Sequence, residues 1–416
     1  MKIISIHEGF DYIKISESNE KNTLNSKQIN ALEKYIVTKK LNKNFFLWER
    51  DKFRIVNYCG FISFLDVVIE ILPKTQINKE YDVAYERRAL INMLRESRFI
   101  NINYSSLSLL DLQKDDLMEI FAFLFSEKLK NELIKGIYRE YVKQEDDLSI
   151  LKGKLNIKNQ IKNIYKNNRK VNCTFSSFEE SNLLNSCFYT FSKYLVTKVK
   201  SIKTQENLKF INLTFCDIPL INLEEITLKK ITFNRNNKRF HESFILLNKL
   251  MFSNSSLGKR GEKQGFSLMF EVNILYETYI GKVLQKKLSN LDVKLQDSSR
   301  KLLINAKTSR GIFQLKPDIV IDNIIIDTKW KLLNNSNRHG VCREDLYQMY
   351  AYATRYLNIE RVILLYPLVS EEYENGEILE EWYIEEQENK KIQVIVIDYS
   401  SKEKTIEGLE KIGFLN

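Results

Sequence analysis

Two aspartates and a lysine lie close together in a strongly apolar stretch of the last third of the chain. Asp318 follows Pro317, Asp327 comes nine residues later, and Lys329 is two residues beyond Asp327. A pair of carboxylates can bind a divalent cation, and a nearby amine can orient a water molecule or offset developing negative charge. This combination is typical of metal-assisted hydrolysis of a phosphodiester bond.

The residues between the two aspartates predict how they are positioned. Asp322 and Asn323 separate two runs of β-branched residues, which is typical of a two-residue hairpin turn. That turn predicts a register with these opposed pairs: Ile321–Ile324, Val320–Ile325, Ile319–Ile326 and Asp318–Asp327. Lys329 then shares a face with Asp327.

Opposed carboxylates destabilise a sheet unless something compensates their charge. Mg²⁺ suits such a pair because it prefers hard oxygen ligands, and Mn²⁺ can substitute for it. We therefore expect Asp318 and Asp327 to bind the metal and Lys329 to act on its water. The alternative is a solvent-facing acidic pair with a salt-bridged lysine.

Regular elements around the hairpin predict a small sheet flanked by helices. The periodicity indicates helices over 268–287 and 344–357. Strands are expected near 293–296, 312–321, 324–331, 361–367 and 392–398, before a short terminal helix. The resulting order is αβββαβ, an α/β arrangement.

Two of these helices carry further candidate residues. Gln348 and Tyr352 are four residues apart on the second helix and therefore share a face. Glu277 lies on the first helix, where Glu271 is a competing candidate. The alternative for the second helix is an ordinary amphipathic helix with a buried tyrosine.

The preceding 255 residues predict a mixed α/β region. A helix is expected over 28–37, and two strands over 53–72, broken at Cys59-Gly60 and stopped by Pro73. Apolar stripes predict further helices, over 116–135 and from Leu184 to Val199. The polar, glycine-containing segment 253–265 predicts a boundary between regions 1–255 and 256–416.

Charge is unevenly distributed along the chain. Residues 151–250 contain 18 lysines and arginines against 7 aspartates and glutamates, a net charge of +11, whereas residues 371–416 carry 5 against 13, a net charge of −8. A concentrated positive stretch suits a phosphate backbone, and the alternative is a solvated surface balanced by the acidic C-terminal stretch.

Other features exclude several classes of site. The five cysteines form no CxxC pair, which argues against disulfides and structural zinc and fits a reducing cytoplasm. No secretory core or run long enough to span a membrane is present. The chain also lacks a GxxxxGK[ST] phosphate loop, so we expect it to bind no nucleotide itself.

The segment from Pro317 to Lys329 resembles the two motif halves of the PD-(D/E)xK nuclease superfamily. Gln348 and Tyr352 resemble the QxxxY element of its RecB-like branch, which implies a position near the substrate or metal. The superfamily often supplies an additional acidic residue from the helix before the sheet, which implies a role for Glu277. The resemblance implies a restriction-endonuclease-like fold for residues 256–416.

A closer resemblance, to McrC proteins, extends over most of the chain. It rests on four stretches in shared order, residues 68–74, 151–155, 273–277 and 345–353, together with the nuclease motif. McrC is the nuclease subunit of McrBC-type restriction systems, which implies Mg²⁺-dependent cleavage of double-stranded DNA. It also implies a McrB-type AAA+ GTPase partner, whose ring the N-terminal region enters and whose GTPase it stimulates.

Two alternatives to this function are open. One is a free-standing RecB-like nuclease of repair or recombination, distinguished by the absence of a motor GTPase encoded nearby. The other is a non-enzymatic DNA-binding adaptor that keeps the fold, against which the complete set of Asp318, Asp327 and Lys329 argues. Methylation dependence is also open, because family members pair with motors of differing specificity.

Overall fold

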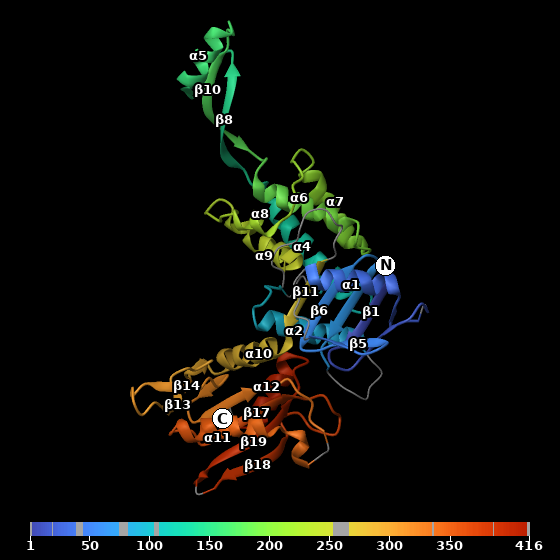
Figure 1. Cartoon of the computed structure of the whole chain (residues 1–416), viewed down its shortest axis with the longest axis vertical. Coiled ribbons are helices and arrows are strands. Elements are labelled where there is room, and N and C mark those ends of the chain that lie inside the picture. The colour runs from blue at the N-terminus through green and yellow to red at the C-terminus, as the bar shows by residue number, and fades with distance from the viewer. Residues whose placement is uncertain are drawn as a thin grey trace. The chain divides into compact units, whose positions relative to one another are not determined.

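The computed structural model describes residues 2–18, 20–38, 45–74, 82–103, 108–252, 266–334, 337–385 and 387–413. They form a mixed α/β structure, as predicted (Figure 1). The chain divides into two compact units. Unit 1 contains residues 1–118 and 261–416, and unit 2 contains residues 119–260.

The compact units group the chain differently from the predicted regions 1–255 and 256–416, because the first 118 residues belong with the C-terminal part. The division into a partner-binding region, 1–255, and a nuclease domain, 256–416, is a division by function and stays a prediction. The expected boundary segment, 253–265, lies outside the described residues.

Strands from both parts of unit 1 build one four-stranded sheet. Its order is β1 (Lys2–His7), β7 (Val67–Leu72), β6 (Tyr58–Phe64) and β11 (Phe266–Glu271). Only the β1–β7 pairing among these is parallel. A second sheet contains β3 (Thr23–Leu24), β2 (Ile13–Ile15), β5 (Lys52–Ile55) and β4 (Phe46–Trp48). Both sheets share an apolar core with α1 (Ser26–Thr38), which confirms the helix expected over 28–37.

The predicted strand break at Cys59-Gly60 is wrong, because both residues lie inside β6. Gly60 has a φ of 133°. A Cβ at this position would overlap the carbonyl oxygen of Leu268 on β11. The glycine therefore allows two backbones to approach closely instead of marking a turn. The expected stop at Pro73 is confirmed, since β7 ends at Leu72.

A buried ion pair joins this sheet to helix α2 (Val83–Glu96). The guanidinium of Arg87 donates two hydrogen bonds of 2.7 Å to the carboxylate of Glu70 on β7, which is fully buried. Glu70 also accepts hydrogen bonds from the Ser5 hydroxyl and the Leu117 amide, at 2.7 and 2.9 Å. Every hydrogen-bonding direction of this carboxylate is thus used, as burial of a charge requires.

The helix predicted over 268–287 begins later than expected. Residues Phe266–Glu271 form β11, and α10 runs from Val272 to Lys287. β11 pairs with β6, about two hundred residues earlier in the chain. Local periodicity cannot reveal a pairing over that separation, so the long-range contact overrides the helical pattern.

The C-terminal sheet of unit 1 has six strands in the order β12-β15-β16-β17-β19-β18. These are Val293–Leu295, Ile319–Ile321, Ile324–Thr328, Arg361–Pro367, Gln387–Ile397 and Ile378–Ile384. Helix α11 (Arg343–Arg355) packs against β17 and β19, and α10 and α12 (Lys402–Lys411) complete the layer arrangement. A 3-10 turn, Asn337–Gly340, precedes α11. The expected αβββαβ order is present, with β18 added.

The predicted strand over 312–321 is interrupted. Gly311–Gln314 is β14, which pairs with β13 (Lys301–Ile304) as a separate two-stranded ribbon. Pro317, which has no N–H to donate to a ladder, precedes β15. The interruption leaves Asp318 directly before β15, at the end of a strand that lies between β12 and β16.

Unit 2 is a group of helices with a long antiparallel hairpin. Its helices are α4 (Leu117–Ile134, which begins in unit 1), α6 (Leu183–Val196), α7 (Ile202–Thr214), α8 (Glu225–Lys229) and α9 (His241–Phe252, after the 3-10 turn Lys238–Phe240). The hairpin pairs β8 (Glu140–Leu148) with β10 (Val171–Glu179), and β9 (Lys154–Leu155) and α5 (Ile157–Tyr165) lie between them in sequence. α4 and α6 confirm the helices expected there.

Candidate active site

The hairpin that carries the two aspartates has the predicted register. Ile319 pairs with Ile326, Val320 with Ile325 and Ile321 with Ile324. Asp322 adopts a positive φ of 46°, as the first residue of a tight hairpin turn does. The turn thereby brings the end of β16 beside the residue that precedes β15.

Asp318 and Asp327 lie beside each other at that end of the hairpin. Asp318 accepts two hydrogen bonds of 2.8 Å from Thr328, one from its amide and one from its hydroxyl. Asp327 is almost completely buried in β16, where it is aligned with Leu364 of the parallel strand β17. Thr328 thus fixes the first carboxylate, and the central strand fixes the second.

Lys329 lies against the second aspartate. Its ammonium is 2.6 Å from Asp327 and 3.6 Å from Asp345, and it donates a 2.9 Å hydrogen bond to the Gln348 side chain. The Gln348 amide in turn donates to the Tyr352 hydroxyl at 2.7 Å and lies 3.4 Å from Asp327. The structure therefore brings Gln348 and Tyr352 of α11 to the same place as Lys329.

Glu277 is the acidic residue of α10 that faces this place. The Gln296 side-chain amide donates to Glu277 and lies 3.5 Å from Asp318, so it joins the two carboxylates. Glu271 is instead engaged by the Tyr58 hydroxyl at 2.7 Å, at the end of β11. The geometry distinguishes the two candidates and brings Glu277 into the group.

The close approach of these carboxylates changes their acidity. Burial, and then the charges of Asp318 and Asp327, raises the pKa of Glu277 to about 7. Burial, and then the charge of Asp318, raises the pKa of Asp327 to about 6 despite the nearby Lys329. Burial also raises the pKa of Asp318. Burial alone would lower the pKa of Lys329, but Asp327 and Asp345 offset it and the pKa is raised, which keeps the ammonium charged.

Three further residues of the site escape the sequence pattern. Asp345 of α11 binds Lys331, at 2.7 Å, and lies 3.6 Å from the ammonium of Lys329. Its spacing of three from Gln348 on one helix face could have revealed it. Thr328 and Gln296 have no comparable signal, because only the folded hairpin brings them to Asp318.

The site is also tied to the N-terminal sheet of unit 1. The Trp330 indole donates a 3.0 Å hydrogen bond to Glu8, which also accepts from the Asn57 amide. The Trp330 ring lies edge-on to Tyr276 and Tyr399, with centroids 5.3 and 5.1 Å away. The residues next to Lys329 and Glu277 are thus held in one aromatic cluster.

The donor set suits a hard cation that keeps much of its water. Among the described residues, no three His, Cys, Asp or Glu side chains form a complete cage for a metal ion. Mg²⁺ needs only one or two protein carboxylates, since water and phosphate oxygens complete its shell. The negative charge of Asp318 contributes to the raised pKa of Asp327. A bound cation would offset the repulsion between these two carboxylates.

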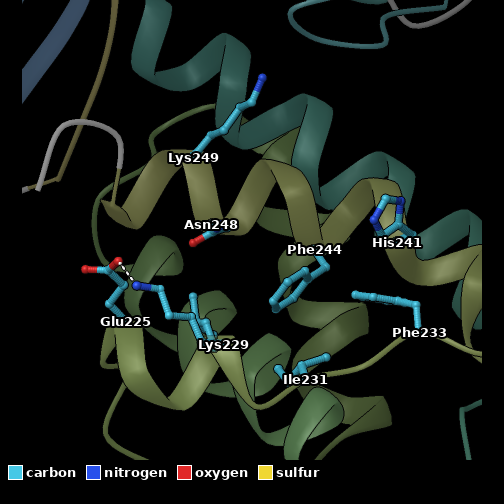
Figure 2. A pocket seen from close by; sticks show the side chains of 9 residues that line it. Glu225, Lys229, Ile231, Phe233, His241, Phe244, Asn248 and Lys249 are labelled. Carbon is cyan, nitrogen blue, oxygen red and sulfur yellow. Dashed lines mark ion pairs between the residues drawn. The ribbon is translucent and has the colours of Figure 1, made fainter. Parts of the chain in front are cut away.

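A pocket in unit 2 is separate in sequence from this group. It has a volume of about 450 Å³ and lies between α8 and α9 (Figure 2). Phe233 and Phe244 form an apolar wall, with ring centroids 5.3 Å apart, and the Glu225–Lys229 ion pair of 2.7 Å lies at its rim. The residues that line this pocket include no pair of carboxylates. The candidate active site is therefore the group around the hairpin of unit 1.

Comparison with known proteins identifies the family. The family described as McrBC 5-methylcytosine restriction system component matches residues 53–367, about three quarters of the chain. The chain belongs to this family. It is therefore a subunit of a McrBC-type restriction system, as the resemblance to McrC implies. No curated protein matches the sequence.

Two solved structures share the fold of this McrBC-system subunit. One, a half-complex from a tetradecameric assembly of Thermococcus gammatolerans McrB AAA+ hexamers with bound McrC, has a TM-score of 0.75 and 20% identity, and the match covers 99% of this chain and 100% of the other. The other is the Thermococcus gammatolerans McrBC complex, with a TM-score of 0.54, 24% identity and coverage of 69% and 88%. No described helix is long and apolar enough to cross a membrane.

Proposed function

We propose that this chain is the McrC-type nuclease subunit of its system and hydrolyses phosphodiester bonds of double-stranded DNA. The observation that carries the proposal is the convergence of Asp318, Asp327 and Glu277 beside the ammonium of Lys329. Carboxylates with raised pKa values around one position are typical of a functional site and costly in a purely structural one.

Asp318 and Asp327 would hold Mg²⁺, or Mn²⁺ in its place, with Glu277 as the third nearby carboxylate. When bound, the ion would lower the pKa of a water molecule and stabilise charge on the phosphate. Histidine and cysteine, the ligands zinc prefers, are missing from the described residues of the group.

Lys329 is held in place to act on the attacking water or on the developing charge. Asp327 and Asp345 keep it protonated, and Gln348 accepts one of its hydrogen bonds. Gln348, anchored by the Tyr352 hydroxyl, fixes the direction of the ammonium. These two residues would position the group and the incoming phosphate instead of taking a proton themselves.

The proposed partner is a McrB-type AAA+ GTPase oligomer. The matched assembly contains McrB hexamers with bound McrC, and the match covers nearly all of this chain. The sequence contains no GxxxxGK[ST] phosphate loop, which agrees with a separate motor that supplies nucleotide hydrolysis. We infer that the chain stimulates this motor and cleaves, in the cytoplasm, the DNA that the motor recognises. The specificity of the motor would then decide whether that DNA has to be methylated.

Helix α5 of unit 2 offers a surface for that partner. Ile157, Ile161 and Ile164 are spaced along one face, with 68%, 48% and 65% of their surface exposed. The segment 149–178 around them contains seven lysines and arginines and no acidic residue. An exposed apolar face is typical of a protein contact.

A plasmid cleavage assay tests the proposal, with the chain and a McrB-type GTPase encoded next to it purified together. The purified chain and motor should cut DNA with GTP and Mg²⁺, and Asp327→Asn should abolish cutting. Asp292→Asn is the matched control, because the side chain of Asp292 is 75% exposed before β12. Cleavage by the Asp327→Asn chain would refute the assignment. Cleavage without the motor would favour the free-standing nuclease, and no cleavage by wild type would favour the adaptor.

A further inference from the structure

The ribbon of β13 and β14 is an exposed structure that the proposed chemistry does not use. Its strands pair with each other, Lys301 opposite Gln314 and Leu303 opposite Ile312. They pair with no other described strand and form a ribbon apart from the six-stranded sheet (Figure 1). The chain passes from the ribbon through three residues, 315–317, directly to Asp318.

The charge of the ribbon is entirely positive. Residues 300–316 contain five cations and no acidic residue: Arg300, Lys301, Lys307, Arg310 and Lys316. None of the five forms an ion pair within the described part of the chain, whereas lysines elsewhere in unit 1 commonly do. Lys316 interacts electrostatically with Asp318 and Glu277. The other four cations have no acidic residue within the segment, so they repel one another and favour a polyanionic partner.

Large apolar side chains are exposed between these cations. Leu303 and Ile304 of β13 are 52% and 65% exposed, and Ile312 and Phe313 of β14 are 36% and 67% exposed. Phe313 also adopts a positive φ of 56°, an uncommon conformation for a residue with a side chain. Several large apolar side chains exposed together indicate a contact surface.

The base of the ribbon is fixed relative to the candidate active site. The Arg355 side chain of α11 donates to the Lys301 carbonyl at 3.1 Å, and the Leu315 amide donates to the Arg300 carbonyl at 3.0 Å. Leu315 is buried in the same apolar cluster as Tyr352. A molecule held by the ribbon is therefore held at a defined position relative to Asp318.

We propose that the ribbon of residues 300–316 binds in a groove of the double-stranded DNA substrate. Its cations contact phosphates on either side, and its apolar side chains contact base edges or sugars. A two-stranded ribbon fits the width of the major groove, and apolar side chains are also used as wedges in the minor groove. This inference rests on the proposed function for the identity of its ligand.

Binding of a short fluorescent DNA duplex, measured in EDTA so that nothing is cut, tests the ribbon. The double variant Lys307→Gln/Arg310→Gln should bind more weakly, and the slope of log affinity against log salt should fall by roughly 1.8, for two lost phosphate contacts. The matched control is Lys27→Gln/Lys34→Gln on α1, which removes two exposed cations from the same unit and should change neither quantity.

Phe313→Ala provides an independent readout. It should weaken duplex binding severalfold while leaving the salt slope unchanged, because it removes an apolar contact and no charge. Unchanged affinity and slope in the double variant would overturn the proposal. Unchanged DNA binding with altered self-association in sedimentation would overturn it in favour of a protein contact. If wild type binds the duplex but does not cut it with the motor, the proposed function fails, and the binding result is still informative about the ribbon.

Discussion

Lys329 forms its ion pairs with Asp327 and Asp345, whereas Asp318 is held by Thr328 and Gln296. These different partners separate the roles of the residues. An ammonium cannot ligate a cation, so Lys329→Ala should retain metal binding and reduce turnover by on the order of 10²- to 10⁴-fold. Asp318→Ala should lose both, since it removes an oxygen ligand.

Calorimetric titration of Mn²⁺ into each purified variant, with cleavage measured in parallel, checks this prediction. Circular dichroism controls for folding. If Lys329→Ala loses metal affinity as severely as Asp318→Ala, Lys329 has no separate role in the chemical step. If both variants bind metal and cut normally, the hairpin is structural and the adaptor function becomes the better explanation.

Glu277 predicts a specific pH dependence. Its folded pKa, about 7, lies above its ordinary value of 4.5, so the folded protein holds this proton more tightly than the unfolded chain does. Without metal, its contribution to the free energy of unfolding is complete below pH 4.5 and is lost as the pH rises through 7. A bound cation displaces the proton of Glu277. The affinity for metal should therefore increase as the pH rises from 4.5 to 7.

Thermal unfolding of wild type and Glu277→Gln in EDTA, from pH 4 to 8, isolates this contribution. The difference between the unfolding temperatures of the two proteins should change between pH 4.5 and 7 and should be constant above pH 7. Metal titrations of the two proteins should differ in pH dependence over the same interval. A difference that is independent of pH would show that Glu277 does not sense the carboxylate pair.

Single residues also show how far the sequence is informative. The turn at Asp322-Asn323 determines the hairpin register by local geometry, so the positions of Asp318, Asp327 and Lys329 were predictable, and the spacing of Gln348 and Tyr352 placed them on one face. Gln296 and Thr328 were not predictable, because their contacts to Asp318 exist only after β12, β15 and β16 pair. The choice between Glu277 and Glu271 depended on where α10 begins, because Glu271 is the last residue of β11 and Glu277 lies within the helix.

At the scale of elements, strand β17 (Arg361–Pro367) matches its predicted bounds, because a short, continuous apolar run is typical of a buried parallel strand. β11 was predicted as helix, and the ribbon strand β14 was joined to β15. In each case a partner distant in sequence, or a proline within the segment, decides the structure. Local patterns therefore predict a continuous apolar run well, but they do not reveal a partner that lies far away in the sequence.

The Glu70–Arg87 pair predicts the stability of the elements it joins. Glu70→Ala would leave the buried guanidinium without its counter-charge and should reduce the free energy of unfolding by about 3–5 kcal/mol. Urea denaturation measures this loss. The control is Glu49→Ala, which removes an exposed ion pair with Lys52 and should leave the denaturation midpoint nearly unchanged. Equal effects of the two substitutions would contradict the structural role of the buried pair.

At the scale of the whole molecule, the two compact units change how the partner surface must be tested. A fragment that lacks residues 1–255 would lose β6, the strand that pairs with β11, and the Glu8 carboxylate that binds Trp330. Loss of activity in such a fragment would report misfolding as readily as loss of a partner surface. Point substitutions within unit 2 avoid this ambiguity.

Replacing Ile157, Ile161 and Ile164 of α5 with serine should abolish stimulation of the motor's GTPase. Burial of three such side chains at an interface contributes enough free energy for the loss to weaken the complex by on the order of a hundredfold or more. A matched control replaces Ile202, Leu213 and Leu220, which are similarly exposed in the same unit. Titration of each chain into the motor, with GTP hydrolysis as readout, checks the prediction. Full stimulation by the α5 variant would place the partner surface elsewhere.

The insertion of unit 2 between the two parts of unit 1 has a consequence for synthesis on the ribosome. Strand β6 emerges early, but β11, which covers one of its edges, is translated only after the whole of unit 2. Until then the nascent chain presents β6 as an open edge, the kind of surface that recruits other strands or a chaperone. The same order delays assembly of the carboxylate group, since Glu277 and both aspartates are translated after residue 260. Ribosome-bound intermediates that end before Lys329 therefore lack the complete group of carboxylates and lysine.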